Sequence, residues 1–156
     1  MLIGWSGRVS AADPVVPLRA LLITGGCCHD YANQKEILKK GIEARAHVMV
    51  DQIHCSDTST KPPLPILGNA DYAKGYDVVL ANIFSTVLIE AWPVIAKSLA
   101  RNGDLVVSGI LATQAWDVFK AAAANGLGFT SVITKGKWVT ARGGHMANLI
   151  AKGNDA

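Results

Sequence analysis

Residues 21–31, LLITGGCCHDY, decide the fold that the sequence predicts. The stretch from Arg19 to Thr24 is short, apolar and rich in leucine, and Gly25 and Gly26 stop it. An apolar run of this length that ends in glycine is typical of a buried parallel strand followed by a sharp turn. We therefore expect a strand, a glycine turn and the start of a helix over these residues.

The rest of the chain alternates between helix and strand patterns. Three segments have the spacing of apolar residues that is typical of amphipathic helices, namely 30–46, 86–100 and 113–125. Three short apolar segments are predicted strands, namely 47–53, 76–83 and 104–109. Near the C-terminus, we expect a hairpin of 129–134 with 137–141, and a last strand over 146–151.

This alternation predicts an α/β fold with a three-layer, Rossmann-like open sheet, mostly parallel and with an antiparallel edge at its C-terminal end. Ligands of such sheets bind in the crevice beyond the carboxyl ends of the strands. We therefore expect the site among residues 24–30, 51–55, 82–85 and 109–112. The connection over 56–74 is longer than most, which indicates either a functional insertion or a join.

Apolar side chains on the predicted helices indicate which faces turn inward. Ile37, Leu38 and Ile42 form one stripe of the first helix, which we expect to cover the sheet. Trp92 and Trp116 lie on the faces of later helices, where we expect them in the core.

The composition fits one globular domain over residues 19–152. The chain has 156 residues, of which half are hydrophobic and 17% are charged, unlike a disordered chain. Its net charge of +3 comes from scattered basic residues, so we expect no direct nucleic-acid contact. No apolar run approaches the roughly 18 residues of a membrane span, so we expect no membrane contact either.

The cysteines and the N-terminus indicate the cellular compartment in which we expect the protein. Three cysteines are an odd count and two of them are adjacent, so we expect no disulfide framework and a reducing, cytoplasmic compartment. Residues 1–18 are predicted to be a tail or a truncated signal remnant, because small residues at 9–11 resemble a cleavage site without a basic start before them. Export is the alternative if this segment is a signal remnant.

Two predicted strand ends offer cofactor contacts. Gly25 and Gly26 can present backbone N–H groups and a helix N-terminus to an anion, or can serve only a turn that needs positive φ. Asp51 closes the predicted second strand, where nucleotide-binding folds place a carboxylate for ribose hydroxyls. We therefore predict Gly25, Gly26 and Asp51 as cofactor-binding residues.

The same two strand ends carry side chains that could bind a metal or act as a nucleophile. They are Cys27, Cys28, His29, Asp30, His54 and Cys55. Cys and His from two loops can supply tetrahedral zinc ligands, but no C-x-x-C spacing is present and buried cysteines commonly serve as small apolar residues. We assign no metal. Cys28 with His29 as nucleophile and base is a further hypothesis, although sequence neighbours at a strand end point apart.

Residues from about 12 to 79 resemble the trehalose-utilisation (ThuA-like) family. The resemblance rests on LLITGGCCHDY, QKEILKKGI and DYAKGYDVV. It implies a fold related to class I glutamine amidotransferases and a role in sugar metabolism or hydrolysis. It also implies that His29 and Asp30 face the pocket and act in catalysis.

Residues from 76 to about 139 resemble the PrmA-type ribosomal-protein methyltransferases. The resemblance rests on YDVVLANIFSTVLIEAWPVIAKSLARNGDLVVSGIL and on KGKWV. It implies S-adenosylmethionine as cofactor, an amino group of a ribosomal protein as methyl acceptor, and Asn82 as the residue that holds the acceptor nitrogen. The family's Gly-rich cofactor motif is absent, and TGGCCHD at 24–30 stands in its place.

The two resemblances overlap over 76–79, YDVV, which predicts a junction there. Three functional hypotheses follow. The first is an S-adenosylmethionine-dependent methyltransferase-like domain with Asn82 on the acceptor amine. The second is a trehalose-utilisation-like domain that binds a small molecule, with His29 and Asp30 in its pocket. The third is a folded chimera without catalysis, serving as an interaction module.

Overall fold

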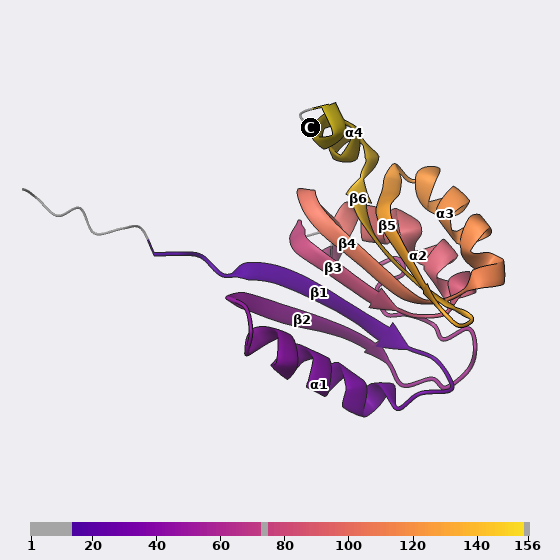
Figure 1. The fold of residues 1–156 in the computed structure, drawn as a ribbon. Coiled ribbons are helices and arrows are strands. Elements are labelled where there is room, and N and C mark those ends of the chain that lie inside the picture. The colour runs from indigo at the N-terminus through magenta and orange to yellow at the C-terminus, as the bar shows by residue number, and fades with distance from the viewer. Residues whose placement is uncertain (1–13, 73–74, 155–156) are drawn as a thin grey trace, which may run out of the picture.

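A computed structural model describes residues 14–72 and 75–154 of the protein. Most of the predicted tail, residues 1–13, lies outside this range. The described chain forms a six-stranded sheet in the order β2-β1-β3-β4-β6-β5 (Figure 1). The strands are β1 (Leu18–Gly25), β2 (Val48–Cys55), β3 (Tyr76–Asn82), β4 (Leu99–Leu111), β5 (Leu127–Lys135) and β6 (Trp138–His145). The α-helices are α1 (Tyr31–Glu43), α2 (Ser85–Ser98), α3 (Ala115–Ala123) and α4 (Met146–Asn154).

The sheet is parallel from β2 to β4 and antiparallel at β6. β1 pairs in parallel with β2 and β3, and β3 pairs in parallel with β4. β6 runs antiparallel to β4 and to β5, with which it forms the expected hairpin. The predicted mostly parallel sheet with an antiparallel C-terminal edge is therefore confirmed.

The two faces of β1 build two separate layers. Successive strand residues point to opposite faces, so Leu21 and Ile23 join the large cluster under α2 and α3. Ala20 and Leu22 instead join a small cluster that Ile42 of α1 covers. Helices on both faces of the sheet make the three layers that the sequence predicts.

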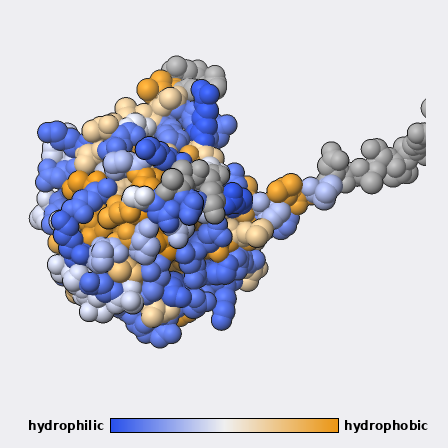
Figure 2. Space-filling view, turned by 180° about the vertical axis from the view of Figure 1, so that it is seen from behind, coloured by the Kyte–Doolittle hydropathy of each residue, from blue (hydrophilic) through white to orange (hydrophobic). Residues whose placement is uncertain are grey.

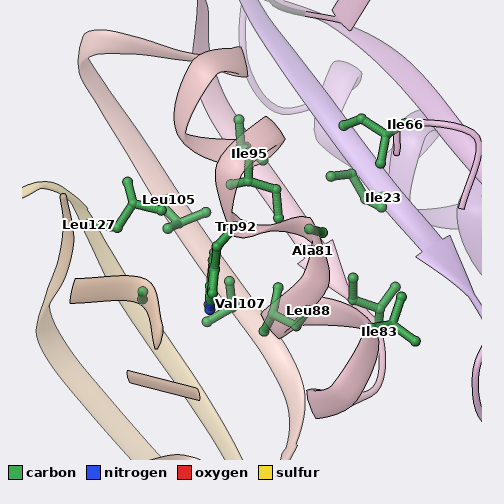
Figure 3. Packing of buried hydrophobic residues seen from close by; sticks show 14 of the residues in the cluster. Ile23, Ile66, Ala81, Ile83, Leu88, Trp92, Ile95, Leu105, Val107 and Leu127 are labelled. Atoms are coloured by element: carbon green, nitrogen blue, oxygen red, sulfur yellow. The ribbon is translucent and has the colours of Figure 1, made fainter. Parts of the chain in front are cut away.

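Trp92 is the largest fully buried side chain of the core. It projects from α2 among Leu88, Ile95 and Leu105, as Figure 3 shows. Its indole Nε1–H donates to the Val118 carbonyl at 3.2 Å. The prediction for Trp92 is confirmed, and its polar atom is satisfied inside the core.

The long connection after β2 contributes to this same core. Leu64 and Ile66 are buried and belong to the large cluster. Figure 3 shows Ile66 beside Ile23 of β1. The part of the connection that the structure describes is therefore anchored by apolar burial.

The predicted inward stripe of α1 is wrong at two positions. Ile37 is 68% exposed and Leu38 is 39% exposed. β2 is an edge strand, and α1 supplies partners for its free backbone groups: Lys39 Nζ donates to the Val50 carbonyl at 2.6 Å, and Glu43 accepts from the Val50 amide at 2.9 Å. These polar contacts set the rotation of α1 and leave Ile37 and Leu38 outside.

Two further expectations are wrong. Trp116 is 76% exposed, because it lies on the side of α3 opposite the buried Val118 and Ala122. The predicted last strand, residues 146–151, is instead part of the helix α4. The preceding strand, β6, includes Gly143 and Gly144, where neighbouring backbone leaves no room for a Cβ. Apolar residues 146, 149 and 150 have helical spacing.

The rear of the molecule, over α2 and α3, carries apolar side chains within a largely hydrophilic surface (Figure 2). Over residues 14–72 and 75–154, no helix combines the length and apolar character needed to cross a membrane.

We expect Trp92→Ala to lower the free energy of unfolding by about 3–5 kcal/mol, because it empties a closely packed part of the core. Trp116→Ala is the matched control, since it removes the same side chain from an exposed helix position and should change stability by less than about 0.5 kcal/mol. Urea denaturation of both variants measures the difference. Equal losses would contradict the burial of Trp92.

Candidate functional site

The carboxyl ends of β1, β2, β3 and β4 lie at one edge of the sheet, and the tip of the β5–β6 hairpin reaches the same edge (Figure 1). A cavity of about 390 Å³ opens there. Its lining comprises Cys28, His29, Tyr31, Asn82, Phe84, Ser108, Gly109, Lys137, Trp138 and Thr140. This volume lies within the roughly 300–1,000 Å³ of small-molecule sites. We call it the main cavity.

A smaller cavity of about 160 Å³ lies between the ends of β1 and β2 and the start of α1. Gly26, Asp30, His54, Cys55 and Thr58 are among its lining residues. His29 and Tyr31 line both this side cavity and the main cavity. The two cavities are therefore neighbours on either side of these residues.

Gly26 brings the β1–α1 turn against the residue that precedes α2. Its φ is +106°, and a Cβ atom at this position would lie 3.0 Å from the ring of Phe84. Gly25 packs against Cys55 of β2 in the same way, with a Cβ position 3.1 Å from the Cys55 carbonyl oxygen. Gly26 lines the side cavity, whereas Gly25 lines neither cavity.

Asn82 is the last residue of β3 and lines the main cavity. A Cβ atom at position 109 would lie only 2.8 Å from Asn82 Oδ1, and Gly109 has a φ of +80°. Only glycine leaves the space in which this amide oxygen lies. An amide oxygen in such a place can accept a hydrogen bond from an amine.

His29 and Asp30 lie between the two cavities and the start of α1. The His29 ring meets the Tyr31 ring edge to face at 5.6 Å. Asp30 is the N-cap of α1 and accepts from the Asn33 amide at 3.1 Å. Burial raises the pKa of the Tyr31 phenol above its ordinary value.

The structure does not bring Asp51 to the crevice. β2 ends at Cys55, two residues later than predicted, so Asp51 is four residues from the strand end. Its carboxylate accepts from the Tyr76 hydroxyl at 2.8 Å and lies 3.6 Å from Arg19. Asp51 therefore belongs to a polar group with Arg19 and Tyr76, which lie near the amino ends of β1 and β3.

Cys27 and Cys28 form a disulfide with each other, while Cys55 is a free thiol. A bond between neighbouring residues joins no distant segments of the chain, so it does not make a disulfide framework. Sulfur in a disulfide is neither a thiolate nucleophile nor a metal ligand. Within the described ranges, no group of three or more His, Cys, Asp or Glu side chains could hold a metal ion. In this structure Cys28 therefore presents no thiolate to His29.

Sequence reasoning missed several lining residues. Phe84 lies in the predicted crevice segment 82–85, but its apolar character gave no sign of a role of its own. Trp138 and Thr140 reach the main cavity only because the hairpin folds back beside β4. No local pattern reveals that contact.

Solved structures with this arrangement are Rossmann-like methyltransferases. The ribosomal protein L11 methylase of Lactobacillus delbrueckii subsp. bulgaricus superposes with a TM-score of 0.55 at 15% identity, covering 85% of this chain and 72% of that one. The T. thermophilus 16S rRNA N2 G1207 methyltransferase (RsmC), solved with AdoMet and guanosine, also gives 0.55, at 18% identity over 86% of this chain and 36% of its own. At these identities the likeness defines the class of fold.

Comparison of the sequence with family models identifies the family. The model of the ribosomal protein L11 methyltransferase (PrmA) family matches residues 43–145, about two thirds of the chain. The chain belongs to this family. Over 65 residues, it is 40% identical to the ribosomal protein L11 methyltransferase of Rhizobium leguminosarum bv. trifolii and 37% identical to that of Agrobacterium fabrum. Each match covers 42% of this chain and 22% of the relative, so the chain matches about a fifth of the relatives' length.

These matches bear on the predicted junction. The family match begins at residue 43, well before the overlap at 76–79, and the L11 methylase structure covers both sides of it. The methyltransferase resemblance is confirmed and extends further towards the N-terminus than the sequence motifs indicated. The trehalose-utilisation resemblance and the chimera receive no support.

We expect Gly109→Ala to lower stability more than Gly136→Ala. Both glycines have positive φ, so each variant incurs the roughly 1–2 kcal/mol cost of a left-handed alanine. Only at position 109 does the new Cβ meet a neighbour, Asn82 Oδ1, because no heavy atom lies within 4 Å at position 136. Urea denaturation measures both variants. Equal losses would contradict the close packing of Asn82 on Gly109.

We also expect the unfolding free energy to fall between about pH 10 and 12 and to fall less in Tyr76→Phe. Burial, then the hydrogen bond and charge of Asp51, raise the pKa of Tyr76 to about 12. Below pH 10 the phenol is protonated in both states. Between pH 10 and 12 only the unfolded chain loses this proton, so folding weakens by up to roughly 1.4 kcal/mol per pH unit. Denaturation at pH 9, 10 and 11 measures the slopes, with Tyr72→Phe as control, and identical slopes would contradict this assignment.

Proposed function

We propose that the crevice is the site of an S-adenosylmethionine-dependent amino-group methyltransferase. The observation that carries this proposal is Asn82, whose amide oxygen lies against Gly109 in the wall of the main cavity. A fixed acceptor of this kind can bind an amine N–H and direct the nitrogen lone pair into the cavity. Family membership supports this chemistry.

The residues around the glycine turn fit the cofactor. Gly26 lets the backbone approach a ligand between β1 and α1, and the side and main cavities share the walls of His29 and Tyr31. Asp30 offers a carboxylate that can accept from ribose hydroxyls, and His54 lies in the same side cavity. S-adenosylmethionine, when bound, supplies an activated methyl group on sulfur. Gly26, Asp30 and His54 would hold it, whereas Gly25 and Asp51 would not touch it.

The proposed acceptor is an amino group of a ribosomal protein. Relatives that carry the name ribosomal protein L11 methyltransferase support this choice, although the matched segment is about a fifth of their length. The chain's own residues have two tasks in the reaction. Asn82 orients the amine, and the aromatic side chains of Phe84 and Trp138 exclude water from the main cavity.

Isothermal titration with S-adenosylhomocysteine tests the cofactor assignment. We expect micromolar binding, and about tenfold weaker binding by Asp30→Asn, which retains a good helix N-cap but loses the charged acceptor. Asp51→Asn is the matched control and should bind within twofold of the unmodified chain. Absence of heat at millimolar ligand would overturn the proposal.

The variant Asn82→Ala tests acceptor binding separately from cofactor binding. This variant should keep its affinity for S-adenosylhomocysteine within about threefold and should lose methyl transfer to ribosomal protein L11 in an assay with labelled methyl donor. Full transfer by the variant would remove Asn82 from the proposed role.

A further inference from the structure

The disulfide between Cys27 and Cys28 stands at the main cavity, which Cys28 lines. The two residues are neighbours in the chain, so the bond closes a small ring through the peptide group between them. Such a bond constrains only the turn between β1 and α1. The methyl transfer that we propose uses neither sulfur.

The backbone of Cys28 is the second observation. Its φ is +78°, and every other residue of the described chain with positive φ is a glycine. A Cβ atom makes this left-handed region unfavourable, so a residue with a side chain stays there only where its surroundings fix it. Among the described residues, no backbone–backbone hydrogen bond involves Cys27, Cys28 or His29. The covalent bond to Cys27 is therefore the constraint that the structure offers for this conformation.

The turn leads directly to residues of the crevice. His29 follows Cys28 and lines both the main and the side cavity. Its ring meets the Tyr31 ring edge to face at 5.6 Å, and Asp30, between them, is the N-cap of α1. A change in the Cys28 backbone reaches His29 across one peptide bond. The state of the disulfide therefore affects a wall that the two cavities share.

We propose that the Cys27–Cys28 pair is a redox switch for the crevice. In the disulfide state, the bond holds Cys28 at positive φ and keeps His29 between the two cavities. A dithiol reduces this state: two electrons pass to the disulfide, the bond between the two Sγ atoms breaks, each sulfur gains a proton, and the dithiol closes to a cyclic disulfide. Cys28 then takes the negative φ that its Cβ favours, and His29 leaves its place between the cavities.

The consequence for ligand binding rests on the proposed function, whereas the change in the turn does not. A turn that is already ordered lowers the entropy cost of binding a ligand. We therefore expect reduction to weaken the binding of S-adenosylhomocysteine about fivefold.

Counting free thiols tests the bond itself. In the full chain purified without reductant, iodoacetamide under denaturing conditions should modify one cysteine, Cys55, which is a free thiol. After dithiothreitol treatment it should modify all three cysteines. Mass spectrometry counts the adducts. Three adducts without dithiothreitol would overturn the proposal.

Spectra of the full chain test the turn without any ligand. In ¹H–¹⁵N correlation spectra, the signals of Cys27 and Cys28 must change on reduction, because the bond between their own side chains breaks. The switch predicts that the amide signals of His29 and Tyr31 shift as well, while those of α3 stay in place. Shifts confined to the two cysteines would contradict it.

Isothermal titration with S-adenosylhomocysteine, with and without dithiothreitol, tests the effect on binding. The double variant Cys27→Ser/Cys28→Ser should bind like the reduced chain under both conditions. Cys55→Ser is the matched control, since it removes the cysteine outside the disulfide and should keep the fivefold response to dithiothreitol.

The results separate this proposal from the proposed function. Equal affinity with and without dithiothreitol would overturn the switch and leave the cofactor assignment intact. Absence of binding under both conditions would instead contradict the cofactor assignment, and the spectra would still decide whether the turn responds to reduction.

Discussion

β1 is buried on both of its faces, and this double burial organises the other elements. Leu21 and Ile23 require cover from α2, α3 and the connection that carries Ile66, while Ala20 and Leu22 require cover from α1. A strand with two apolar faces can satisfy its backbone only between two other strands, which β2 and β3 provide. The crevice is a consequence, because three parallel strands that share one register must end at one edge.

Close contacts at two glycines then shape the carboxyl ends of these strands into a site. The ring of Phe84 lies where a side chain at Gly26 would be, and the Asn82 amide lies where one at Gly109 would be. Each contact joins segments that are distant in sequence. Phe84 and Asn82 therefore lie directly against glycine backbone, in space that a side chain at either glycine would fill.

Phe84 gives the edge two compartments. On one side are the main and side cavities, in which we propose that the methyl donor and the amine bind. On the other is a further cavity of about 600 Å³, which Thr86, Ile89 and Leu111 help to line. The methyl transfer that we propose uses only the first compartment.

The sequence by itself determined the order of strands and helices up to β6, the parallel sheet, the burial of Trp92 and the position of Asn82 at a strand end, because local periodicity and strand-end position carry that information. Tertiary structure decided the remainder. Asp51 lies outside the crevice because strand pairing extends β2 two residues beyond its predicted end. Ile37 is exposed because α1 is oriented to give Val50, on an edge strand, its polar partners. Trp138 lines the main cavity because the β5–β6 hairpin places β6 beside β4. Such contacts depend on pairing between distant segments, which no local pattern of residues encodes.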